Sequence, residues 1–235
     1  MTITVHNRVV IADGCEPRSR ALAGVQLLPN GDLLVGYRLA SRHPVGDHDM
    51  IDDGKVVTTR SQDGGCTWSE PRSVVALLGW DCSGGNRMVQ TPERDLIMFV
   101  MRARRAVDPE SHVHPIRSDD GGISWDPMGP EMRLFDWFTE PHVMGHVLVT
   151  SDGKWMVPVY GADELGSDTY TAVAFSDDQG QSWGNKVVVA GPSELGFYEA
   201  AVIRVRGGRF MAVIRTQKPP FDSYMSHSND EGQTW

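Results

Sequence analysis

Short apolar stretches, each bounded by glycine, proline, asparagine or aspartate, recur along the chain. The first of them predict a strand over 21–28, a tight turn at 29–31 and a returning strand over 33–38. A third strand is expected over 55–60 and a fourth over 72–78. No stretch of ten or more residues has the apolar period of a helix. The pattern therefore predicts an all-β chain built from antiparallel hairpins.

Three further segments repeat this layout. The remaining strands are expected at 87–90, 96–102, 112–117, 142–149, 154–161, 169–175, 185–190, 199–205, 209–215 and 223–228. Four antiparallel strands in a unit of roughly 50 residues are typical of a blade of a β-propeller. We expect one domain over 1–235 with repeats at about 18–79, 80–134, 135–192 and 193–235.

One eight-residue phrase marks every repeat. It reads SQDGGCTW from Ser61, SDDGGISW from Ser118, SDDQGQSW from Ser176 and SNDEGQTW from Ser228. Its Asp can accept backbone hydrogen bonds in a turn, its Gly permits a positive φ, and its Trp can pack between sheets. Calcium would need about six converging oxygens, whereas each Asp stands alone in its turn. We interpret as structural the residues Asp63, Trp68, Asp120, Trp125, Asp178, Trp183, Asp230 and Trp235.

Charge and composition narrow the function classes. The formal net charge of −9 argues against a nucleic-acid binder or an anionic-membrane binder. Three cysteines, Cys15, Cys66 and Cys82, lack the spacing of a disulfide framework or a zinc site, and we expect reduced thiols. The chain has no apolar run of about 20 residues and no recognisable secretory signal, so a cytoplasmic location is the default expectation.

Strand direction predicts where a site would lie. The repeated phrase follows the third strand of each blade, so the opposite end carries the starts of first strands and the ends of second strands. The polar residues expected at that end are Arg20, Arg38, Asn86, Arg87, Arg102, Arg104, Arg105, Glu140, His142, Tyr160, Glu199 and Arg215. Charged side chains at the inner ends of strands are costly to desolvate unless they pair or bind a ligand.

The repeated phrases resemble the Asp boxes of sialidases (neuraminidases), whose fold is a six-bladed β-propeller. The resemblance extends from about Arg18 to Trp235 and implies that about four of six blades are present, the fourth without its last strand. We therefore expect the natural protein to be longer. Asp boxes also occur in other glycosidases and in non-enzymatic propellers, so the boxes alone do not assign the function.

Three local segments carry the resemblance further. GDHDMIDDGKVVTTRSQDGG resembles the loop that supplies the acid/base aspartate, which would be Asp47 or Asp49. YEAAVIRVRGGRFMAVIR resembles the hairpin that supplies a glutamate and an arginine, here Glu199 and Arg215. PRSRALAGVQLLPNGDLL resembles the segment of the first substrate arginine, Arg20, but it lacks the usual Arg-Ile-Pro signature, so Arg18 remains the alternative.

The resemblance implies an exo-α-sialidase that releases terminal sialic acid with retention. Arg20, Arg38 and Arg215 would bind the substrate, Asp47 or Asp49 would act as acid/base, and Glu199 would take the proton of a tyrosine nucleophile. That tyrosine and the third arginine of the carboxylate clamp come from later blades of the family, and no residue here is assigned to them. The expected partner is a sialylated glycan or another acidic sugar, without a metal or organic cofactor.

Two other function classes stay open. The chain could belong to a glycosidase or lyase for another sugar, which would keep the boxes and need different carboxylates. It could also be a non-catalytic propeller that binds glycans or proteins.

Overall fold

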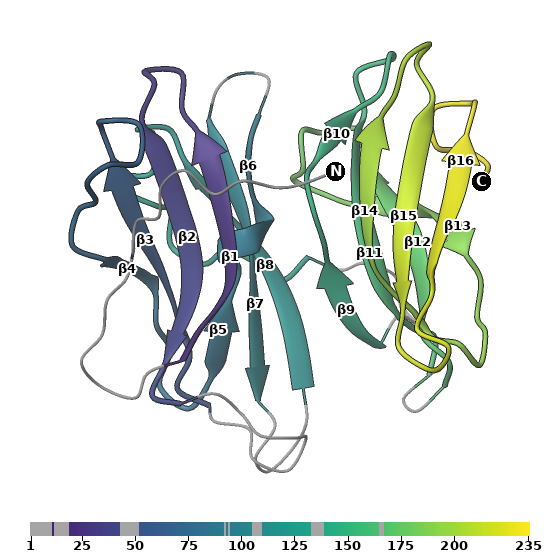
Figure 1. Ribbon diagram of the computed structural model, residues 1–235, viewed down its shortest axis with the longest axis horizontal. Coiled ribbons are helices and arrows are strands. Elements are labelled where there is room, and N and C mark those ends of the chain that lie inside the picture. The colour runs from purple at the N-terminus through teal and green to yellow at the C-terminus, as the bar shows by residue number, and fades with distance from the viewer. Residues whose placement is uncertain are drawn as a thin grey trace, which may run out of the picture.

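The computed structural model describes residues 11, 19–42, 52–91, 93, 95–104, 110–132, 139–164 and 167–235. They form four antiparallel sheets, arranged as the blades of a β-propeller (Figure 1). The predicted all-β fold class, with four blades marked by Asp boxes, is confirmed. In the described part of the chain, no helix has the length and apolar character needed to cross a bilayer.

The blades follow one another along the chain. Blade one comprises β1 (Ser19–Leu27), β2 (Leu33–Ala40), β3 (Lys55–Ser61) and β4 (Arg72–Val75). Blade two comprises β5 (Asp81–Ser83), the 3₁₀ turn η1 (Gly85–Arg87), β6 (Met88–Gln90), β7 (Leu96–Arg104) and β8 (Glu110–Ser118). Blade three comprises β9 (Thr139–Val143), β10 (Leu148–Val149), β11 (Trp155–Ala162), β12 (Tyr170–Ser176) and β13 (Gly184–Ala190). Blade four comprises β14 (Phe197–Arg204), β15 (Phe210–Thr216) and β16 (Ser223–Ser228).

The first strand departs from the predicted pattern in two blades. The single strand expected at 87–90 is preceded by β5, and both β5 and β6 pair with β7. The single strand expected at 142–149 is likewise divided into β9 and β10, both paired with β11. A break in the first strand changes the direction of its side chains, which matters for the site described below.

Apolar layers between the blades hold them together. Alternate residues of β7 point to opposite sides of the sheet. Met98 packs toward blade one with Leu34, and Phe99 packs toward blade three with Val157. A third layer joins blade three to blade four. Because every residue from Leu96 to Val100 is fully buried, β7 reads as a continuous apolar run rather than an alternating one.

The Asp boxes form the same hydrogen-bonded turn four times. In the third, the Ser176 hydroxyl donates to Asp178 at 2.7 Å, and Ser182 donates to the same carboxylate through its backbone N–H at 2.8 Å and its hydroxyl at 2.5 Å. The indole N–H of Trp183 donates to the Gly180 carbonyl at 3.2 Å. These bonds, the one from the Ser182 side chain foremost, hold the pKa of Asp178 at about 2.

The other three boxes reproduce the contacts between serine and aspartate. They differ in one tryptophan, because the buried indole nitrogen of Trp125 has no hydrogen-bond partner among the described residues. The boxes are therefore turn locks whose carboxylates are already satisfied by the chain.

Polar contacts also join neighbouring blades at the end of the sheets that carries the boxes, which we call the box end. Arg60 of blade one donates to the Gly121 carbonyl in the second box, and Arg117 of blade two donates to the Gln179 carbonyl in the third. Both arginines immediately precede the serine of their own box. The position before the third box is Phe175, so this repeated contact is replaced at the junction with blade four.

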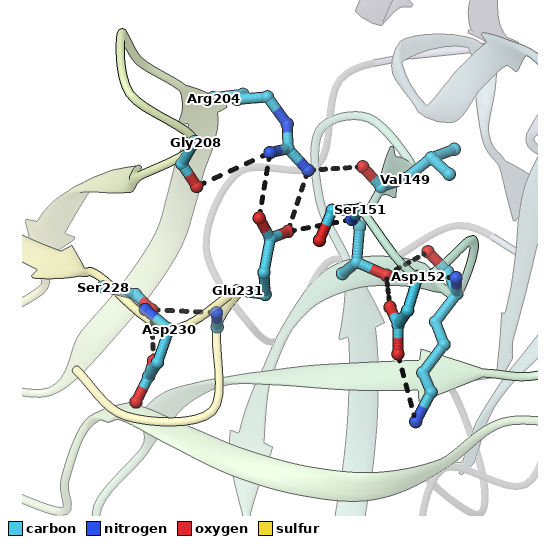
Figure 2. Close-up of polar contacts among 11 residues, drawn as sticks. Val149, Ser151, Asp152, Arg204, Gly208, Ser228, Asp230 and Glu231 are labelled. Carbon is cyan, nitrogen blue, oxygen red and sulfur yellow. Dashed lines mark hydrogen bonds and ion pairs between the residues drawn. The ribbon is translucent and has the colours of Figure 1, made fainter.

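Figure 2 shows the replacement. Arg204 donates to both carboxylate oxygens of Glu231, at 3.2 and 3.0 Å, and to the Val149 carbonyl at 2.6 Å. The Ser151 amide donates to the same carboxylate at 3.2 Å. The hydrogen bond from Arg204 is the main reason that the pKa of Glu231 is lowered.

Candidate functional site in the central channel

The first strands of the blades line the centre of the propeller and are irregular in all four blades. First strands of adjoining blades meet there, as β1 does with η1 and β6. In blades one and four the irregularity is a β-bulge, at Leu22 and at Glu199, whose φ angles are +53° and +50°. A non-glycine residue in this left-handed region is strained, and such strain concentrates where a side chain must be re-aimed.

Glu199 and Arg215 are brought together by this bulge. Tyr198 pairs with Arg215 across β14 and β15, while Glu199 is the extra residue in the ladder. The Arg215 guanidinium donates to the Glu199 carboxylate at 2.5 Å and to the Gln217 amide oxygen at 2.9 Å. The contact expected between Glu199 and Arg215 is therefore present, and both side chains keep part of their surface in solvent.

Aromatic rings from blades three and four form a wall beside this pair. His142 and Tyr160 are cross-strand partners in β9 and β11, and their rings stack at 4.6 Å with an interplanar angle of 5°. Tyr160 also contacts Tyr198, with ring centroids 5.2 Å apart. The hydroxyl of Thr169 lies 3.0 Å from that of Tyr198. Tyr160 is only 8% exposed, so this wall is a packed aromatic cluster.

Blade two contributes Arg87 through η1. The turn lies so close to blade one that a Cβ on Gly85 would come within 2.1 Å of the Gly36 backbone. A Cβ on Gly24 would similarly approach Asn86 to 2.8 Å. Only glycine permits such close packing of two backbones. The consequence is that Arg87 leaves the strand ladder and is 2% exposed.

The electrostatic surroundings of Arg87 connect three blades. Desolvation lowers the pKa of the Arg87 guanidinium, and its interactions with Tyr160 and Glu199 partly oppose that effect. Blades two and four share no core layer among the described residues. The interaction between Arg87 of blade two and Glu199 of blade four therefore places Arg87 on the side of blade two that faces the centre of the propeller.

Arg20 and Arg38 occupy different surroundings. Arg20 is half-buried in β1 and donates a hydrogen bond to Tyr37, whose pKa is raised chiefly by burial in spite of that contact. Arg38 is 4% exposed, and its Nε donates to Asp81 of blade two at 2.7 Å. Arg38 thus forms a buried ion pair between blades one and two, while its assignment to substrate binding stays a prediction.

Some predicted residues have no described surroundings. Asp47, Asp49 and Arg105 lie outside the described residues, as does Arg18. Arg102 and Arg104 both lie over the Trp80 ring at 4.3 Å, which places them in a cluster of blade two separate from Glu199. That stacking explains their position without a ligand.

Other possible sites are less well supported. Two cavities of about 570 and 710 Å³ lie at the box end, lined by residues of the second and third boxes such as Gly121 and Trp183. Neither is lined by Glu199, Arg215 or Arg87. The described residues contain no group of three or more His, Cys, Asp or Glu placed to hold a metal ion.

The fold and the site define a class: an Asp-box propeller with charged and aromatic residues in its channel. Residues 38–235 match the model of the BNR repeat-like domain, and the chain belongs to that family. No curated protein sequence matches the chain.

Solved structures share the fold at low sequence identity. A protein of unknown function from Dyadobacter fermentans is 19% identical with a TM-score of 0.81, covering 96% of this chain and 70% of its own. The NanB sialidase from Streptococcus pneumoniae is 13% identical with a TM-score of 0.72, covering 99% of this chain and 54% of its own. An α-L-arabinanase from Penicillium chrysogenum is 17% identical with a TM-score of 0.64, covering 92% and 64%.

These likenesses concern the β-propeller fold and do not identify a substrate. The chain spans about half the length of the NanB sialidase. At these identities, the likeness to the sialidase and to the arabinanase shows the β-propeller fold alone.

Proposed function

We propose that this chain is part of a glycoside hydrolase of the exo-α-sialidase type, which releases terminal sialic acid with retention. The observation that supports it best is the Glu199–Arg215 pair, with its 2.5 Å contact, on a strained bulge beside Tyr198. The guanidinium contact holds the Glu199 carboxylate in one orientation, as a residue that accepts a proton requires. Tyr198, which packs against Tyr160, places an aromatic ring next to this pair.

The remaining roles follow the sialidase scheme as hypotheses. Arg215 and Arg20 bind the sialic acid carboxylate, with Arg38 as a further candidate. Asp47 or Asp49 protonates the leaving oxygen and then activates water. Glu199 draws the proton from a tyrosine nucleophile, to which no residue of this chain is assigned.

A substitution at Glu199 tests the proposal. Glu199→Gln keeps the size of the side chain and removes its charge, so kcat/KM on a fluorogenic sialoside should fall by at least about a hundredfold. Glu194→Gln is the matched control, because Glu194 is an exposed residue of the same repeat. Hydrolysis by Glu199→Gln at the rate of the control would contradict the assigned role.

A second candidate is a glycosidase for a neutral sugar. The likeness to the arabinanase favours it, because that enzyme has the same fold. A panel that includes a fluorogenic arabinoside separates the two candidates: turnover of the arabinoside and not of the sialoside supports the second. Binding of sugars without turnover of any substrate supports a non-catalytic propeller.

A further inference from the structure

Arg87 is a buried arginine without a described partner. Its side chain is 2% exposed, and neither Nε nor Nη1 has a hydrogen-bond partner among the described residues. Arginine is almost never this buried unless it is paired, because an isolated charge is costly to remove from water. Asn86 beside it has a buried side-chain oxygen in the same condition. These polar groups therefore need an explanation that the described fold does not supply.

The position of Arg87 indicates that the missing partner is in the channel. The ionisable groups that interact with the guanidinium are Tyr160 of blade three and Glu199 of blade four, of which Glu199 is the anion at neutral pH. Glu199 is already bonded to Arg215 at 2.5 Å. Arg87 and Arg215 thus both interact electrostatically with Glu199, and one carboxylate does not neutralise two guanidinium groups.

The η1 turn that carries Arg87 packs unusually close to the backbone of blade one. Any Cβ at Gly85 would collide with the Gly36 backbone at 2.1 Å, so the η1 turn depends on two glycines in contact. A first strand that continued straight would have paired with β7 without this restriction. Local irregularity that is costly to keep is typical of a binding position.

We propose that Arg87 binds the carboxylate of an acidic sugar in the channel, and so supplies from blade two an arginine that the sialidase scheme takes from a later blade. The choice of sialic acid as that sugar rests on the proposed function, whereas the anion site does not. The planar guanidinium presents parallel N–H groups that match the two oxygens of a carboxylate. Burial strengthens such a contact and excludes competing water.

Two probes and three variants test this proposal. The probes are the sodium salts of N-acetylneuraminic acid and galacturonic acid, with galactose as the neutral comparison, and binding is measured by titration calorimetry. Arg87→Met removes the charge at similar volume, and Arg87→Lys keeps the charge without the planar fork. Arg206→Met is the matched control, since Arg206 is exposed in the turn between β14 and β15.

The expected result has two parts. Arg87→Met should weaken binding of N-acetylneuraminate about ten- to hundredfold, with Arg87→Lys between it and the wild type. The ligand-free Arg87→Met protein should also have a higher Tm than the wild type, because it no longer buries an unpaired charge. A purely structural arginine would give the opposite shift in Tm, and Arg206→Met should change neither quantity.

The outcomes separate this proposal from the proposed function. If galacturonate binds in an Arg87-dependent manner and N-acetylneuraminate does not, the anion site stands and the sialidase proposal falls. If Arg87→Met binds both anions as the wild type does, or if neither anion binds the wild type, the anion site is overturned. A lower Tm for ligand-free Arg87→Met would overturn it as well, because Arg87 would then have a structural partner.

Discussion

The buried Arg38–Asp81 pair gives the sharpest test of how blades one and two are joined. Arg38 Nε lies 2.7 Å from Asp81, and the two side chains are 5% and 12% exposed. We expect Arg38→Met to destabilise the protein strongly, because it removes a charged contact of 2.7 Å from the largely buried Asp81 carboxylate. Met fills a similar volume, so the loss of charge and not a cavity dominates the effect.

The magnitude follows from the burial of both partners. Removing one member of a buried ion pair costs about 3–5 kcal/mol, because the remaining charge stays desolvated. For a chain of this length, each kcal/mol lowers Tm by about 2–4 °C. Arg38→Met should therefore lower Tm by about 6–20 °C. Removing both charges in Arg38→Met/Asp81→Leu should recover most of the loss, since an apolar pair of similar volume needs no partner.

Urea and thermal unfolding followed by tryptophan fluorescence measure these changes, and the chain has seven tryptophans to report them. Arg72→Met serves as the control, because Arg72 lies exposed in β4 of the same blade and should stay within about 0.5 kcal/mol of the wild type. The double variant completes a thermodynamic cycle that isolates the interaction of Arg38 with Asp81.

A loss below about 1 kcal/mol in Arg38→Met would refute the reasoning, since exposed ion pairs have effects of that size. Arg38 would then be available to a ligand, as its assignment to substrate binding requires. If the loss is large and sialoside affinity is unchanged in the double variant, Arg38 acts by joining the blades.

Three further predictions concern the box end. Gly232→Ala should lower the free energy of urea unfolding by about 2–4 kcal/mol, because the φ angle of Gly232 is +86° and a new Cβ would lie 2.6 Å from the Met156 sulfur. Gly207→Ala is the control: its φ angle is +80° but the space around it is open, so only the backbone strain of about 1–2 kcal/mol should appear. Asp178 should remain ionised down to about pH 2, because its pKa in the folded protein lies below the unfolded value of 3.8. The stability that Asp178 contributes is therefore complete above pH 3.8 and is lost as the pH falls through 2. A carboxyl-carbon NMR titration and an acid unfolding curve measure these two changes. Glu231→Gln should lower the free energy of unfolding by about 0.5–1.5 kcal/mol, because it removes the ion pair with Arg204 within blade four and weakens the contact from the Ser151 amide of blade three (Figure 2). An unchanged urea midpoint would contradict this.

The box end could be predicted from the sequence almost completely. The boxes are local motifs in which donor and acceptor lie within four residues of each other, as Ser176 and Ser182 do around Asp178. Such contacts depend on sequence spacing alone, so the box turns can be predicted from the amino-acid sequence. The strands of blade one were also predictable, because turns at 29–31 and an apolar alternation fix their register.

The channel could be predicted only in part. The hairpin that joins Glu199 to Arg215 follows from strand spacing, but the bulge that re-aims Glu199 has no signal in a segment of ordinary strand residues. The division of the first strand in blade two does have a signal, the Gly84-Gly85 pair within the predicted first strand region. Its consequence, the burial of Arg87, depends on contact with Gly36 about fifty residues earlier, which no local pattern contains.

The carboxylates of the boxes and the buried arginines of the channel differ in how their hydrogen bonds are satisfied. At the box end, carboxylates such as Asp178 have their oxygens bonded by the turn itself, so a ligand would gain little there. In the channel, Arg20, Asn86 and Arg87 keep buried polar atoms that no described residue satisfies. Unpaired buried groups lower stability, and a fold retains them where a ligand or water completes them. The strained bulge at Glu199 lies at the same centre, so backbone strain and unsatisfied buried polar groups occur together where we place the substrate.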